Sequence, residues 1–129
     1  MKNSKPKTIL LVEDEESLIK IIKKKLEDDG FQVFNARSVK EALSCLKKIK
    51  KVDVVWLDHY LLGKENGLDL LVKMRKKGSS WKKIPVFLVS NTASADKVEA
   101  YMQLGISKYY VKANHGLDEI ISEIKKAIF

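Results

Sequence analysis

The chain has 129 residues, of which 45% are hydrophobic and 33% charged, and its formal net charge is +8. This length suits one domain with a single sheet and is too short for two domains. No apolar run approaches the roughly 20 residues of a membrane helix, and the apolar run after the basic start is too short for a signal peptide. Cys45 is the only cysteine, which excludes an internal disulfide. We expect a cytoplasmic domain over residues 8–129, preceded by a flexible basic tail over residues 1–7.

The positive charge is carried by small groups of lysines spread along the chain. Such a charge favours attraction to acidic partners and permits contact with nucleic acid. No aromatic residues alternate with these lysines as stacking platforms for bases. We therefore do not expect specific nucleic-acid binding.

The first half of the chain predicts two strand–helix units. Residues 8–13 are apolar at four consecutive positions and predict a buried strand, followed by a helix whose inward stripe is Leu18, Ile22 and Leu26. Residues 31–36 mix polar and apolar residues, as in an edge strand with one wetter face. Ser38 and Glu41 have the spacing of a capping box and predict the start of the second helix.

The second half predicts three more units. Residues 53–57 contain four consecutive apolar residues and predict a central strand, residues 84–90 predict another, and residues 108–111 a short fifth. Ser94 is a candidate cap for the fourth helix. The inward positions of the third and fourth helices are predicted to be Leu68, Leu71, Val72 and Met74, then Val98, Tyr101 and Met102.

Strand and helix alternate five times, which predicts an α/β fold with a single parallel (βα)5 sheet and helices on both faces. Three strands are apolar throughout and should be central, whereas the second and fifth should be edges. That assignment fits the doubly wound, flavodoxin-like strand order 2-1-3-4-5.

Polar residues follow four of the predicted strands. They are Glu13 with Asp14, Asp58, Ser90 and Lys112. Because parallel strands end at the same edge of a sheet, these side chains should converge there. Converging carboxylates repel one another unless a cation lies among them, and hard oxygen ligands suit Mg²⁺. A carboxylate nucleophile, a divalent metal, a lysine and a hydroxyl can together accept a phosphoryl group.

With these motifs in place, the chain resembles the receiver domain of two-component response regulators from about Thr8 to Ile128. The matching pieces are Leu10-Leu11-Val12-Glu13-Asp14, Val55-Trp56-Leu57-Asp58, Gly67-Leu68, Pro85-Val86-Phe87-Leu88-Val89-Ser90 and Tyr109-Tyr110-Val111-Lys112.

The resemblance implies a phosphorylation switch. Asp58 would accept a phosphoryl group from a phosphohistidine on a sensor histidine kinase or a histidine phosphotransfer protein. Glu13, Asp14 and Asp58, with the backbone carbonyl of Tyr60, would hold Mg²⁺ or Mn²⁺. The remaining roles implied are phosphate pairing for Lys112, the switch hydroxyl for Ser90 and the aromatic switch for Tyr109. The surface formed by the fourth helix, the fifth strand and the fifth helix would then signal to a downstream partner protein.

Three positions depart from the family's usual pattern. Leu62 and Ala113 stand where prolines are common, and Asn91 replaces a small residue beside the switch hydroxyl. Since a cis bond without proline costs about 2.5–4 kcal/mol, the bond between Lys112 and Ala113 should be trans. What then aims Lys112 is left open.

Three aromatic or imidazole side chains near the predicted site invite separate hypotheses. His59 follows Asp58, but adjacent residues at a strand end point apart, so a chemical role is the weaker interpretation. His115 is expected to be structural or solvated, beside Asn114 as a candidate cap. Tyr60 is expected to shield an aspartyl phosphate from water.

The leading interpretation is a stand-alone receiver that catalyses only its own phosphorylation and dephosphorylation and is otherwise not an enzyme. The alternative is a pseudo-receiver that binds partners without using phosphate. An aspartate-nucleophile phosphatase is weaker, because Tyr60 stands where such enzymes carry a second Asp, and a nucleotide binder is weaker still, because no glycine-rich phosphate loop follows a strand. A fragment of a longer regulator and a phosphorylation-linked homodimer are left open.

Overall fold

A computed structural model describes residues 6–91 and 94–129. In this part of the chain five parallel strands form one sheet in the order β2-β1-β3-β4-β5, which confirms the predicted topology. The strands are β1 Thr8–Val12, β2 Gln32–Ala36, β3 Val54–Leu57, β4 Val86–Ser90 and β5 Lys108–Val111. Most of the predicted basic tail, residues 1–5, lies outside the described residues.

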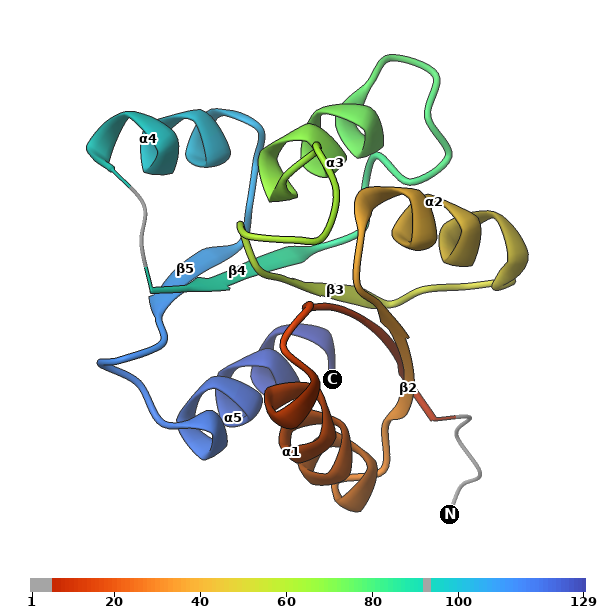
Figure 1. The fold of residues 1–129 in the computed structure, drawn as a ribbon. Helices are drawn as coiled ribbons and strands as arrows, with labels where there is room; N and C mark the ends of the chain where they lie inside the picture. The colour runs from red at the N-terminus through yellow and green to blue at the C-terminus, as the bar shows by residue number, and fades with distance from the viewer. Residues whose placement is uncertain (1–5, 92–93) are drawn as a thin grey trace.

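Helices cover both faces of the sheet, as Figure 1 shows. They are α1 Glu16–Asp28, α2 Val39–Lys48, α3 Gly67–Arg75, α4 Ala95–Gln103 and α5 Leu117–Ile128. Helices α1 and α5 lie on one face, whereas α2, α3 and α4 lie on the other (Figure 1). No helix within the described residues is long and apolar enough to cross a membrane.

The sheet has a hydrophobic core on each face, because side chains alternate between the two faces along each strand. In β1, Leu10 and Val12 pack toward α2 and α3, while Ile9 and Leu11 pack toward α1 and α5. Strands β1, β3 and β4 are buried along their whole length, which explains why nearly all of their residues are apolar. This rigid centre fixes the carboxyl ends of the three strands beside one another.

Several helix starts form as the sequence predicts. The Ser38 hydroxyl accepts a hydrogen bond from the Glu41 backbone N–H, and the Ser94 hydroxyl accepts one from Lys97. The reciprocal bond of the predicted capping box is shifted by one residue, since the Glu41 carboxylate accepts from the backbone N–H of Arg37. Helix α5 is capped at Gly116, so the prediction of Asn114 as its cap is wrong.

Two predicted inward positions are also wrong. Val72 in α3 is 51% exposed and Met102 in α4 is 56% exposed. Helix α3 buries residues 67, 70, 71 and 74, a spacing that turns position 72 to the outside. In α4 the one buried side chain is Tyr101.

Candidate metal and phosphoryl site

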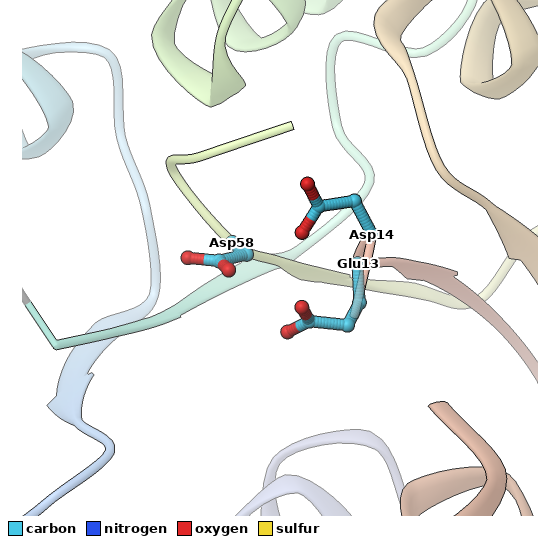
Figure 2. A group of neighbouring side chains, drawn as sticks. All are labelled: Glu13, Asp14 and Asp58. Carbon is cyan, nitrogen blue, oxygen red and sulfur yellow. The ribbon is translucent and has the colours of Figure 1, made fainter. Parts of the chain in front are cut away.

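The predicted acidic residues converge at the carboxyl edge of the sheet. Glu13 and Asp14 follow β1, and Asp58 follows β3, which pairs with β1 in parallel register. One carboxylate oxygen from each of the three residues lies within 4.8 Å of the other two, an arrangement drawn in Figure 2. Three hard oxygen donors at this spacing fit a Mg²⁺ or Mn²⁺ ion, which takes few protein carboxylates and keeps several waters.

Lys112 reaches the same cluster from the end of β5. Its ammonium nitrogen lies 2.8 Å from Glu13 Oε1 and 3.0 Å from Asp58 Oδ2. The pairing of Lys112 with Glu13 was not anticipated from the sequence. Lys112 thereby offsets part of the charge of the three carboxylates, which would otherwise repel one another.

The pKa values of Glu13 and Lys112 are both raised, for different reasons. Burial raises the pKa of the Glu13 carboxyl, and the hydrogen bond from Lys112 opposes part of that rise. Burial also disfavours the charge on Lys112, but the hydrogen bond to Glu13 and the charge of Asp58 outweigh it and raise the pKa of the ammonium. Lys112 is therefore a fixed positive charge at this site near neutral pH.

Two buried oxygen atoms at the site remain unpaired within the described residues. They are Asp58 Oδ1 and Ser90 Oγ. Buried polar atoms normally have a hydrogen-bond partner, so unpaired ones mark positions where a ligand can be received. Ser90 ends β4, and its backbone carbonyl accepts hydrogen bonds from the Lys112 N–H at 3.3 Å and the Tyr109 hydroxyl at 3.4 Å. These contacts join the predicted switch residues to the predicted phosphate-pairing lysine.

Leu62, Asn91 and Ala113, the three departures from the family pattern, each make a hydrogen bond in the structure. The backbone N–H of Leu62 donates to the Arg37 carbonyl oxygen at 3.0 Å, and the N–H of Ala113 donates to Asn91 Oδ1 at 2.8 Å. A proline at position 62 or 113 could make neither bond, because proline has no N–H. The bond between Lys112 and Ala113 is trans, as expected, since the described residues contain no cis peptide bond.

Arg37 is a contributor that the sequence analysis missed. Its guanidinium donates two hydrogen bonds to the Asp14 backbone carbonyl, at 2.8 and 3.2 Å, and so holds the segment that presents the Asp14 carboxylate. Arg37 directly follows β2, which neighbours β1 in the sheet. Its place at a strand end was the signal that could have identified it.

His59 lies away from the carboxylates, in agreement with the weaker chemical role assigned to it. Its side chain is buried, and Nδ1 lies 2.6 Å from the Tyr101 hydroxyl. Burial lowers the pKa of His59, an effect to which the charge of Lys97 adds, and burial raises the pKa of Tyr101. The neighbouring Tyr60 is 48% exposed at the rim of the site. His115, which contacts Glu119 one helical turn along α5, has a structural position on the surface.

A family model for the response regulator receiver domain matches residues 9–125 of this chain. The chain belongs to the response regulator receiver family. Over 104 residues, 81% of its length, this receiver domain is 36% identical to the alginate biosynthesis transcriptional regulatory protein AlgB of Pseudomonas aeruginosa. The chain spans only 22% of the length of that relative.

One solved structure gives the same assignment, and a second shares the fold. The receiver domain of HemR from Leptospira biflexa, in its non-phosphorylated form, matches with 31% identity and a TM-score of 0.81, covering 95% of this chain and 94% of that one. The Mn²⁺-bound form of the response regulator Rcp1 matches with a TM-score of 0.80 and 23% identity, covering 94% of this chain and 93% of that one. At that identity the second likeness shows the fold alone.

Proposed function

We propose that this receiver domain accepts a phosphoryl group on Asp58 from a phosphohistidine of a sensor kinase or a histidine phosphotransfer protein. The observation that carries the proposal is the state of the Asp58 side chain, which is only 7% exposed. One of its oxygens is held by Lys112 and the other has no partner among residues 6–91 and 94–129, with the Glu13 and Asp14 carboxylates beside it. Such a carboxylate is oriented, desolvated and ready to act as a nucleophile.

The reaction needs little covalent chemistry from the protein. A carboxylate oxygen of Asp58 attacks phosphorus, the P–N bond of the donor breaks, and the imidazole nitrogen leaves with the electron pair of that bond. Lys112 then pairs with an oxygen of the new acyl phosphate, and Ser90 donates its hydroxyl proton to another.

Glu13, Asp14, Asp58 and the Tyr60 carbonyl are the groups that would hold Mg²⁺ or Mn²⁺. When bound, the metal would supply positive charge against the transferring phosphoryl oxygens. The donor set supports this part of the proposal, and a response regulator of the same fold, Rcp1, has been solved with Mn²⁺ bound.

Signal output would follow from contacts of the phosphoryl group rather than from turnover of a separate substrate. Ser90 and Tyr109, already joined through the Ser90 carbonyl, would shift together and remodel the α4-β5-α5 surface for a downstream protein. In this proposal the domain works in the cytoplasm and is not an enzyme beyond its own phosphorylation and dephosphorylation. The partner could be another protein or a second phosphorylated copy of this chain. The mass of the complex that the phosphorylated domain forms distinguishes the two.

The proposal is tested by ³¹P NMR of the protein incubated with acetyl phosphate. After acetyl phosphate, itself an acyl phosphate, has been removed, we expect a protein-bound acyl phosphate resonance. It should form only with Mg²⁺, should not form when excess chelator is present during the incubation, and should be removed by hydroxylamine, which cleaves acyl phosphates but not phosphoserine or phosphotyrosine. A protein that neither binds Mg²⁺ nor gains this resonance would instead be a pseudo-receiver that binds partners without phosphate.

A further inference from the structure

A buried hydrogen bond joins α4 to the turn that follows Asp58. His59 Nδ1 and the Tyr101 hydroxyl are 2.6 Å apart, and their rings meet edge to face at 76°. The two residues are 42 positions apart in the sequence, and their side chains are 2% and 0% exposed. A bond between two desolvated groups is costly to leave unmade, so it fixes both partners strongly.

The Tyr101 hydroxyl and the Asp58 carbonyl oxygen both lie against Gly67. A Cβ atom at Gly67 would lie 2.7 Å from this hydroxyl and 2.5 Å from the Asp58 carbonyl oxygen. Gly67 is therefore needed to leave room for the Tyr101 hydroxyl and the Asp58 backbone at one point. The Gly67 N–H also donates to the His59 carbonyl at 2.9 Å. Two helices thus hold the turn at His59. Tyr101 of α4 bonds the His59 side chain, and Gly67 of α3 bonds the His59 backbone.

Tyr101 is also the main attachment of α4. It is the one buried residue of that helix, which otherwise exposes or half-buries its side chains. A second, weaker link runs parallel to it, because Lys97 of α4 lies 5.9 Å from the centre of the Tyr60 ring. The placement of α4 and the geometry of residues 58–60 therefore depend on the same small set of contacts.

We infer that His59 and Tyr101 form a strut that positions the Asp58–Tyr60 turn for cation binding and transmits changes in that turn to α4. The inference rests on the proposed function, in which Asp58 and the Tyr60 carbonyl are metal ligands on either side of His59. Both residues are positioning residues, since neither reaches the three carboxylates. Coupling between two sites is reciprocal, so a cation that fixes the turn must also steady α4.

The test uses Tyr101→Phe, which keeps the buried ring and removes only the hydroxyl, together with His59→Leu and the double variant. Tyr110→Phe is the matched control, because the Tyr110 hydroxyl also makes a 2.6 Å bond, to Glu123 on the opposite face of the sheet. Two quantities are measured for each protein: the Mg²⁺ dissociation constant by calorimetry, and amide hydrogen exchange of α4 with and without Mg²⁺.

We expect Mg²⁺ to slow exchange in α4 of the natural protein and of Tyr110→Phe. In Tyr101→Phe the Mg²⁺ dissociation constant should rise by roughly threefold to tenfold, the effect of one hydrogen bond, and the response of α4 should disappear. His59→Leu should behave alike, and the double variant should be no worse than either single variant, because both changes break the same contact.

Unchanged Mg²⁺ affinity and an unchanged α4 response in Tyr101→Phe would overturn the strut and leave the proposed function standing. Additive losses in the double variant would also overturn it. Failure of the natural protein to bind Mg²⁺ would overturn the strut together with the metal part of the proposed function. If Tyr101→Phe fails to fold, His59→Leu decides by the same two measurements.

Discussion

Lys112 is the cation that pairs with the buried carboxylates of this site. It is 19% exposed and bridges two nearly buried carboxylates, Glu13 and Asp58, that come from different strands. Removing one partner of a buried ion pair is far more costly than exchanging the whole pair for apolar groups, because the remaining charges are left uncompensated. Lys112 therefore compensates the charge of these two carboxylates when no metal is bound.

Lys112→Met keeps most of the side-chain volume and removes the charge. We expect it to lower the free energy of unfolding by about 3 kcal/mol in the absence of metal, the low end for a broken buried pair because Lys112 is partly exposed. Saturating Mg²⁺ should recover part of that loss, since it neutralises the same carboxylates. Urea unfolding with and without Mg²⁺ measures both effects. A loss that Mg²⁺ does not reduce would contradict the assignment of these carboxylates to a cation site.

Asn91 and Ala113 answer the question of how Lys112 is aimed. Their 2.8 Å hydrogen bond ties the residue after Ser90 to the residue after Lys112. The bond is exposed, so its worth is about 0.5–1.5 kcal/mol. It nevertheless acts at the position that directs the Lys112 side chain.

Asn91→Ala removes the acceptor of that bond, and Ala113→Pro removes its donor. Each change should slow phosphorylation by acetyl phosphate by roughly twofold to tenfold, in keeping with the loss of one hydrogen bond, while Mg²⁺ affinity stays the same. The double variant should be no slower than the slower single variant. Rates equal to that of the natural protein in both single variants would show that Lys112 is aimed by other contacts.

At the scale of elements, β5 and α5 are joined by a small polar network. The Glu123 carboxylate of α5 accepts hydrogen bonds from Lys108 Nζ at 2.7 Å and from the Tyr110 hydroxyl at 2.6 Å. These bonds, with that of Lys108 first in importance, lower the pKa of Glu123. Since α4, β5 and α5 form the proposed output surface, this network holds two of its three elements together.

The network predicts a pH dependence of stability. A folded-state pKa below the unfolded value means that charged Glu123 favours the folded state, fully so above the ordinary glutamate pKa of about 4.3. The contribution is lost as the pH falls through the lower folded-state pKa. Glu123→Gln should therefore be less stable than the natural protein at pH 7, and the difference should shrink on acidification to pH 3. Urea unfolding of both proteins at pH 7 and pH 3 measures this difference in stability. A difference that does not change with pH would show that the charge of Glu123 does not stabilise the fold.

The strand order and the acidic site could be predicted from the sequence because each depends on local patterns. Continuous apolar runs mark the central strands. A residue such as Asp58, which comes directly after such a run, must lie at the carboxyl edge of the sheet. The inward faces of α3 and α4 could not be predicted as well, since apolar residues such as Val72 and Met102 lie beside the true stripe and packing alone selects between them. Partners distant in sequence, such as His59 and Tyr101, carry no local signal at all.

At the scale of the whole molecule, lysines gather at the edge of the sheet opposite the acidic site. Helices of a parallel α/β fold run back along the strands, so their last turns lie at the amino edge, away from Asp58. Lysines occupy the last turns of α1, α2, α3 and α5, where they also suit the helix dipole. Lysine groups that look dispersed in the sequence thus collect away from the acidic site, where they do not compete with a cation.

The central claim is that Asp58 is a metal-dependent phosphoacceptor. Its most direct test is the intact mass of the protein after incubation with acetyl phosphate and Mg²⁺, beside Asp58→Asn, which keeps the size of the side chain and removes the nucleophile. We predict a gain of one phosphoryl group in the natural protein and none in Asp58→Asn. The same gain in Asp58→Asn would place the phosphoryl group on another residue and contradict the claim, as would the absence of any gain in a natural protein shown to bind Mg²⁺.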